Sequence, residues 1–190
     1  MKGSTYDGRE LPEERIQEMF GPSEVGMIEQ NLMNQANIAN AISYYCHVYQ
    51  EKHNEYVRPF IPLHDLLVDV KKAGYQIAIF TGKGRRSLDI SLDQLGLNGL
   101  FDVLISGDDV TQLKPDPQGL HIIMKELGSQ PQDMLMIGDS DADIEAGRRA
   151  NVPSIRVDWL PSVSPKSFQY KFDDYMMTDV KELRNLLRLL

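Results

Sequence analysis

The sequence predicts an α/β fold: a Rossmann-like parallel sheet flanked by helices, preceded by a small all-helical segment. Up to about residue 60 the apolar residues recur at helical spacing and no strand is evident. Beyond Pro62, short apolar runs alternate with helical segments, which is typical of a parallel sheet covered on both faces. A length of 190 residues with 42% hydrophobic content suits one domain with a small insertion. We therefore expect a helical segment over residues 1–60 and an α/β core over residues 61–190.

The helices of the segment 1–60 have clear start signals. Pro12 suits the first turn of one helix, and Ser23 is a suitable N-cap for the next. A third helix is predicted by an apolar stripe whose members lie four, three and four residues apart. The stripe consists of Ile38, Ile42, Tyr45 and Tyr49.

The core is predicted to contain five short strands and five helices. Strands are expected at residues 76–80, 103–105, 134–137 and 154–157, with a last short one at 175–177. Helices are expected at residues 63–73, 87–95, 117–127, 141–150 and 180–190. The Pro- and Ser-rich stretch 161–167 is expected to be an exposed loop.

Composition excludes several classes of protein. The net charge is −8, which argues against a nucleic-acid-binding or anionic-membrane surface. Cys46 is the only cysteine, so the chain has neither an internal disulfide nor a Cys-based zinc site. The first residues have no apolar segment of the signal-peptide kind, and no run approaches the ~18 apolar residues of a membrane helix. A cytoplasmic location is the expectation.

In an open parallel sheet, ligands bind beyond the carboxyl ends of the strands, so the residues that follow each strand are the candidates. After the first strand comes the segment Thr81-Gly82-Lys83-Gly84-Arg85. A hydroxyl, backbone amides and cations at a strand-to-helix turn can bind a phosphate, although the Walker pattern is absent. The alternative is a polar turn whose glycines serve the backbone alone.

The segment after the second strand contains Lys114-Pro115-Asp116-Pro117. Asp116 suits the N-cap of the following helix, with Pro117 at its first position. Lys114, which precedes a proline, is held extended and can direct its ammonium into the cleft as a point charge. An ordinary solvated lysine is the alternative.

Three alternating carboxylates, Asp139, Asp141 and Asp143, follow the third strand. Three carboxylates so close together repel one another, which is unfavourable unless a cation compensates their charge. The spacing does not fit an EF-hand loop, whereas Mg²⁺ takes one or two carboxylates and shares phosphate oxygens. As an alternative, Asp141 and Asp143 only complement the dipole of the helix that they begin.

Taken together, residues 77–83, 114–117 and 136–147 resemble the second, third and fourth motifs of the haloacid dehalogenase-like hydrolase superfamily, in its phosphoglycolate phosphatase-like branch. The resemblance implies catalytic roles for Thr81 and Lys114. It implies phosphate binding by Thr81, Gly82, Lys83 and Lys114. It makes Asp139 a direct Mg²⁺ ligand and Asp143 an acid that holds a metal-bound water or Lys114.

The first motif of that superfamily, an apolar strand followed by Asp-x-Asp-Gly-Thr, is not found in the sequence. The nearest string, at residues 5–9, has Thr where the nucleophilic Asp belongs and no strand before it. The helical segment over residues 1–60 resembles part of the small cap that this branch inserts after its first core strand. By the layout of the family the chain begins inside the cap and lacks the first strand, which lies between the strands that carry Thr81 and Asp139. Either the chain is truncated, or another segment fills the slot, for example by strand exchange in a homo-oligomer.

The sequence therefore predicts a Mg²⁺-dependent phosphatase of small phosphorylated metabolites, inactive in this truncated form. The alternative from another class is a pseudoenzyme that binds phosphate or a partner protein without chemistry. A sugar-phosphate mutase is also compatible with the motifs. A dehalogenase is disfavoured, because it needs no Mg²⁺, whereas Asp139 together with Asp143 indicates a Mg²⁺ site.

Overall fold

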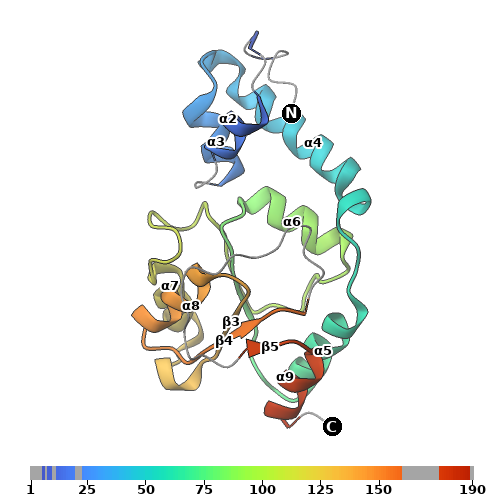
Figure 1. The fold of residues 1–190 in the computed structure, drawn as a ribbon, viewed down its shortest axis with the longest axis vertical. Helices are drawn as coiled ribbons and strands as arrows, with labels where there is room; N and C mark the ends of the chain where they lie inside the picture. The colour runs from blue at the N-terminus through green and yellow to red at the C-terminus, as the bar shows by residue number, and fades with distance from the viewer. Residues whose placement is uncertain (1–5, 7, 10–11, 20–22, 160–175, 189–190) are drawn as a thin grey trace. The chain divides into compact units, whose positions relative to one another are not determined.

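The computed structural model describes residues 6, 8–9, 12–19, 23–159 and 176–188, and Figure 1 shows the order of the helices and strands. By their contacts the residues form two compact units. The helical unit comprises Met1–Pro59, Thr81–Asn98 and Ser106–Thr111. The sheet unit comprises Phe60–Phe80, Gly99–Ile105 and Gln112–Leu190.

The helical unit is built around its longest helix, α4. Its elements are α2 (Glu13–Gln17), α3 (Glu24–Asn31), the 3₁₀ turn η1 (Gln35–Asn37), α4 (Ile38–Tyr56) and α6 (Arg85–Gln94). The predicted cap at Ser23 is confirmed, because its Oγ accepts a hydrogen bond of 3.2 Å from the Gly26 N–H. Helix α4 packs against both α3 and α6.

The strands in the described residues of the sheet unit are all parallel and form two hydrogen-bonded groups. The strands are β1 (Ala78–Phe80), β2 (Val103–Ile105), β3 (Met136–Gly138), β4 (Ser154–Val157) and β5 (Met176–Met177). The helical elements are α5 (Ile61–Lys72), α7 (Gln118–Leu127), the turn η2 (Pro131–Asp133), α8 (Asp141–Arg149) and α9 (Val180–Leu186). One group is β1–β2 and the other is β3–β4–β5. The α/β class with parallel strands is thereby confirmed.

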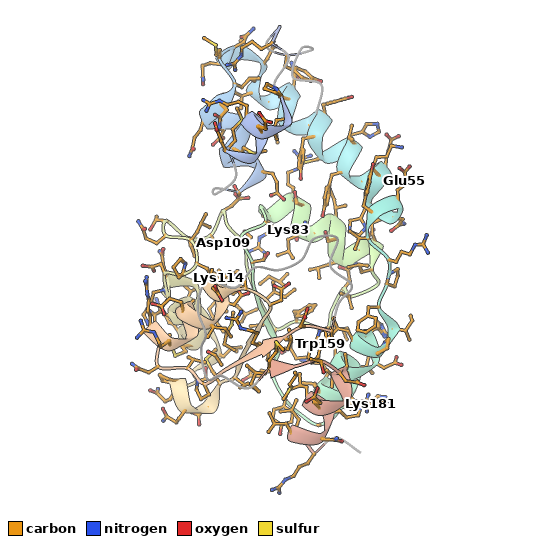
Figure 2. The ribbon with its side chains drawn as sticks, viewed as in Figure 1. Glu55, Lys83, Asp109, Lys114, Trp159 and Lys181 are labelled. Atoms are coloured by element: carbon orange, nitrogen blue, oxygen red, sulfur yellow. The ribbon has the colours of Figure 1, made fainter. Side chains whose placement is uncertain are left out.

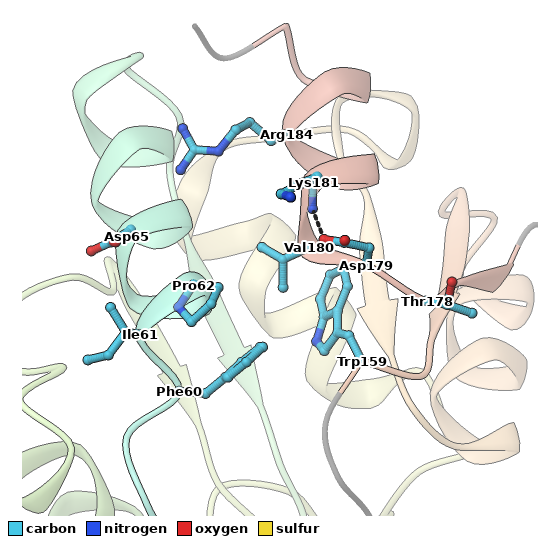
Figure 3. A pocket seen from close by; sticks show the side chains of 10 residues that line it. All are labelled: Phe60, Ile61, Pro62, Asp65, Trp159, Thr178, Asp179, Val180, Lys181 and Arg184. Atoms are coloured by element: carbon cyan, nitrogen blue, oxygen red, sulfur yellow. Dashed lines mark hydrogen bonds between the residues drawn. The ribbon is translucent and has the colours of Figure 1, made fainter.

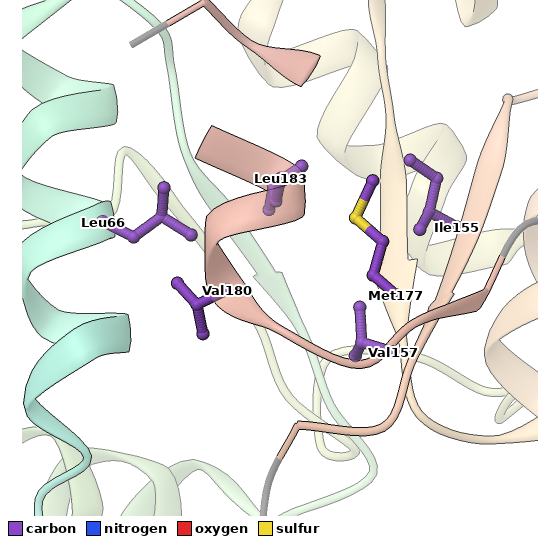
Figure 4. Close-up of a cluster of buried hydrophobic side chains, with 6 residues drawn as sticks. All are labelled: Leu66, Ile155, Val157, Met177, Val180 and Leu183. Atoms are coloured by element: carbon purple, nitrogen blue, oxygen red, sulfur yellow. The ribbon is translucent and has the colours of Figure 1, made fainter. Parts of the chain in front are cut away.

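One hydrophobic cluster joins β4 and β5 to the helices α5 and α9 (Figure 4). Leu66 and Met177 are each 1% exposed at its centre. The cluster consists of Leu66, Ile155, Val157, Met177, Val180 and Leu183. Burial of these side chains, each worth about 1.5–3 kcal/mol, holds the β3–β4–β5 group against its helices.

The boundaries differ from the sequence prediction in several places. Strand β1 begins at Ala78 because the Ile77 N–H donates to the Asp102 carboxylate, 2.7 Å away, and not to a neighbouring strand. Strand β3 lies one to two residues later than predicted. Helix α9 ends at Leu186, earlier than expected. The predicted loop 161–167, Tyr175 and residues 189–190 lie outside the described residues.

Helix α7 also starts later than predicted. Its N-cap is Pro117 and not Asp116, although Asp116 Oδ1 still accepts a 2.9 Å hydrogen bond from the Gln118 N–H. Asp116, one residue before the N-cap, thus accepts a hydrogen bond from an amide of the first turn that has no partner within the helix. None of the helices in the described part of the chain is long and apolar enough to cross a membrane.

Asp102 ties together α5, the start of β1 and the start of β2. Its carboxylate accepts hydrogen bonds of 2.7 and 2.8 Å from Lys71 Nζ and one from the Ile77 amide. The hydrogen bond from Lys71 is the main cause, with the Ile77 amide second, of a pKa for Asp102 below its usual value. A carboxyl whose pKa is lower in the folded than in the unfolded state stabilises the fold above the unfolded value and loses that contribution on acidification.

We therefore expect the free energy of unfolding to fall between about pH 5 and pH 2 partly through Asp102. In an Asp102→Asn variant the stability at pH 7 should be lower and its decline with acidification shallower. Urea unfolding at several pH values in that range measures both. Parallel pH curves for the variant and the original chain would contradict this assignment.

Candidate active site

Lys114 forms the most buried polar contact among the predicted site residues. It follows β2 and precedes α7 in the chain, and its side chain is labelled in Figure 2. Its Nζ donates to the backbone oxygen of Phe80, 2.8 Å away, and to Asp143 Oδ1, 2.6 Å away. The ammonium is also 5.0 Å from the centroid of the Phe80 ring. The side chains of Lys114 and Asp143 are 17% and 7% exposed. One cation thus links the end of β1 to the start of α8.

Asp143 is fixed by a second set of hydrogen bonds. It belongs to the first turn of α8, whose N-cap is Ser140. Asp143 Oδ2 accepts from the Ser140 N–H at 3.1 Å and from the Ser140 hydroxyl at 2.6 Å. This is a capping box, in which N-cap and third helical residue satisfy one another's amides. Both carboxylate oxygens of Asp143 are therefore engaged, one of them with Lys114.

The other two carboxylates of the acidic segment have different surroundings. Asp141 forms an ion pair with Arg156 of β4, whose side chain is 7% exposed. Asp139 comes directly after β3 and is exposed. Within the described residues, no group of three His, Cys, Asp or Glu side chains gathers as a protein-only metal cage would need. The three aspartates therefore do not act as one cluster, and Asp139 is the one open to solvent.

The loop that follows β1 belongs to the helical unit and has a tightly held backbone. Thr81 Oγ1 accepts a 3.2 Å hydrogen bond from the Lys83 N–H, and the Lys83 carbonyl accepts one of 2.7 Å from the Gly107 N–H. The Gly84 N–H donates to Glu24 Oε2 at 2.6 Å. At Gly82, by contrast, an added Cβ would meet nothing within 4 Å. Hydrogen bonds thus fix the backbone of this loop, while Gly82 is exposed and has open space beside it.

The structure brings the predicted residues together in two sets. Lys114 and Asp143 are in direct contact in the sheet unit, which also contains Asp139. Thr81, Gly82 and Lys83 lie together in the helical unit.

Some partners were missed at the sequence level. Ser140 could have been found, since Ser140 and Asp143 have capping-box spacing. Tyr49 was predicted only as a member of the apolar stripe of its helix, and Arg156 was not singled out. Their contacts with Lys83 and Asp141 gave no sequence signal, because both join distant segments.

A separate pocket of about 640 Å³ lies in the sheet unit (Figure 3). Phe60, Pro62 and Trp159 form an apolar wall, and Lys181 and Arg184 contribute charge. Arg184 is itself paired with Asp69 at 2.6 Å. The pocket contains none of the residues that the motifs single out.

Comparisons with known proteins place these features in context. A family model described as haloacid dehalogenase-like hydrolase matches residues 4–157. A protein named pyrophosphatase PpaX, from Bacillus velezensis, is 32% identical over 145 residues, which are 76% of this chain and 67% of that protein. Its namesake from Bacillus cereus strain AH820 is 27% identical over 183 residues, or 96% of this chain and 83% of the relative.

Solved structures share the fold at lower sequence identity. CbbY from Rhodobacter sphaeroides, determined in complex with phosphate, superposes with a TM-score of 0.68 at 21% identity, covering 90% of this chain and 80% of that one. A putative beta-phosphoglucomutase from Thermotoga maritima gives 0.66 at 20% identity, covering 98% and 87%. Both likenesses concern the fold alone.

Proposed function

This chain belongs to the haloacid dehalogenase-like hydrolase family, and from that premise we propose that it is a Mg²⁺-dependent phosphatase of small phosphorylated compounds. The observation that carries the proposal is the buried Lys114–Asp143 pair at the end of β1. A cation that is held rigidly by a carboxylate and a backbone carbonyl is preorganised to stabilise a phosphoryl group.

Each remaining residue of the two sets receives a role in this proposal. Thr81 and the amide of Gly82 bind the oxygens of the transferred phosphoryl group, in keeping with the open face of their loop. Lys83 adds a positive charge beside them. Lys114 offsets the negative charge that the phosphoryl group carries in the transition state. Asp143 acts through Lys114, whose orientation it fixes.

The donor set fits a magnesium ion. Mg²⁺ binds through one or two carboxylates, keeps several waters and completes its shell with phosphate oxygens, so it needs no three-residue cage. Asp139, exposed directly after β3, is the carboxylate that we assign to it. When bound, the ion would supply positive charge to the phosphoryl oxygens. Asp143 is less suited than Asp139 to coordinate the magnesium ion directly, because both of its carboxylate oxygens already accept hydrogen bonds.

No residue of the two sets is suited to accept the phosphoryl group covalently. Among the described residues, β1 pairs only with β2 and β3 only with β4, so each has one edge without a strand partner. We propose that a further strand, carrying the nucleophilic carboxylate, pairs between these two edges, since unpaired backbone groups within a sheet are costly. A second copy of the chain is one source for such a strand.

Hydrolysis of an aryl phosphate and of pyrophosphate, each with Mg²⁺, tests the proposal. We expect the 190-residue chain to be nearly inactive and a version extended by a strand with Asp-x-Asp-Gly-Thr to be active, since loss of a nucleophile costs about a millionfold. Asp139→Asn should abolish the activity of the extended version, which excludes a contaminating phosphatase. The pyrophosphate arm is included because of the name of the bacterial relatives.

The outcomes separate the proposals. Turnover by the 190-residue chain that disappears in Asp139→Asn would refute the need for a further strand and leave the phosphatase proposal standing. Phosphate binding without hydrolysis by either version would favour a non-catalytic phosphate-binding protein, which the absence of the Asp-x-Asp-Gly-Thr motif also favours. A failure to bind phosphate at all would refute both.

A further inference from the structure

Lys83 has a fixed backbone but a side chain that would be free to rotate without a partner. Its N–H and carbonyl are both hydrogen-bonded inside the helical unit, to Thr81 and Gly107. The side chain is directed by Tyr49 of α4, whose hydroxyl accepts a hydrogen bond of 2.6 Å from Lys83 Nζ. The ammonium is also 4.8 Å from the centroid of the Tyr49 ring. Helix α4 therefore determines where this charge lies.

The direction of each hydrogen bond around Tyr49 is determined by the number of protons available. The Ser91 hydroxyl donates its single proton to the Ser87 carbonyl, 2.9 Å away. In the 2.8 Å contact between Tyr49 and Ser91, Tyr49 must then be the donor. Its oxygen is left as an acceptor, which suits the Lys83 ammonium. The result is an ordered chain from Lys83 through Tyr49 and Ser91 to the backbone of α6, and such chains strengthen cooperatively.

This arrangement orients a cation without neutralising it. Within the described part of the chain, no carboxylate lies within ion-pair distance of Lys83, in contrast to Lys114, which forms an ion pair with Asp143. Tyr49 is an uncharged partner and takes up one of the three N–H donors of the ammonium. The charge and the other donors remain available to an anion. A lysine held in this way is suited to bind an anionic ligand and less suited to a purely structural role.

We propose that Tyr49 is a positioning residue, which holds the Lys83 ammonium in place for the oxygens of a bound phosphate group. This inference rests on the function proposed above. Ordering a lysine side chain costs conformational entropy. Because Tyr49 already orders Lys83 in the folded protein, this entropy is lost on folding and not on ligand binding. Without the tyrosine hydroxyl, the cost returns to the binding step.

The test is the dissociation constant of inorganic phosphate, measured by calorimetry on the full chain. Tyr49→Phe should weaken binding about tenfold, because it removes the hydrogen bond and keeps the ring. In a Lys83→Gln background, Tyr49→Phe should have no further effect, since its role is exerted through Lys83. Tyr45→Phe is the matched control: Tyr45 stacks on Tyr49 with centroids 5.8 Å apart, but its hydroxyl bonds to Ser87. Its phosphate affinity should equal that of the original chain.

Three results would overturn the inference. If the original chain binds phosphate and Tyr49→Phe binds equally well, Tyr49 is only a packing residue while the proposed function stands. The same holds if the Tyr49 and Lys83 effects are additive, because the two side chains would then act independently. If the original chain does not bind phosphate, the proposed function fails and this inference fails with it.

Discussion

Replacement of Lys114 by methionine is expected to lower the free energy of unfolding by about 3 kcal/mol, as is usual when one partner of a buried ion pair is removed. Methionine fills a similar volume but leaves the Asp143 carboxylate, 7% exposed, without its cation. The Phe80 carbonyl also loses its hydrogen-bond donor. Binding of inorganic phosphate should fall in the same variant, because the proposed site loses a positive charge.

A double variant separates the charge from the packing. Asp143→Asn keeps an oxygen for the Ser140 amide and removes the buried negative charge. The Lys114→Met/Asp143→Asn chain should therefore be destabilised by less than the sum of the single variants, with a coupling of at least about 1 kcal/mol. Urea unfolding of all four chains gives this coupling. Strict additivity would mean that the two side chains do not interact in the folded protein.

The fold was predictable where apolar runs are sharply bounded. The strands Val103–Ile105 and Ser154–Val157 have the predicted limits, because polar residues or turns flank each run. The start of β1 was not predictable, since it depends on the capture of the Ile77 amide by Asp102, 25 residues further on. A boundary that is set by a distant side chain leaves no trace in local periodicity.

The same distinction applies to the candidate site. Sequence position at strand ends was sufficient to single out the segments around Thr81, Lys114 and Asp139. Position alone could not assign each carboxylate of the acidic segment to a cation, although the family resemblance gave Lys114 as one of two alternative partners of Asp143. In the structure Asp141 pairs with Arg156 and Asp143 with Lys114, so alternate residues of one turn serve different partners. That allocation follows from three-dimensional packing and not from the spacing of the aspartates.

Gly138 is expected to be the glycine least able to accept a side chain. A Cβ at this position would lie 2.3 Å from the Cβ of Asp143 and 2.5 Å from its Cγ. Because the Asp143 Cβ is attached directly to the backbone of α8, no rotation of that side chain relieves the clash. We expect Gly138→Ala to cost about 3 kcal/mol through strain in the first turn of α8, at the upper end of what overpacking usually costs.

Gly147→Ala provides the matched comparison, because its nearest contact is even closer and yet should cost much less. An added Cβ there would lie 1.9 Å from Ser154 Oγ, which can move away by a change of rotamer at the cost of its 3.0 Å hydrogen bond to the Val152 carbonyl. The other near atoms, Ser154 Cβ and the Val152 carbonyl oxygen, are both 3.3 Å away and need to shift by only a few tenths of an ångström. Alanine also favours the helical conformation of α8 by up to about 1 kcal/mol. Thermal unfolding should therefore place Gly147→Ala near the original chain and Gly138→Ala well below it. Equal stability of the two variants would contradict the view that Gly138 is required by Asp143, and with it the rigid support that Asp143 gives to Lys114.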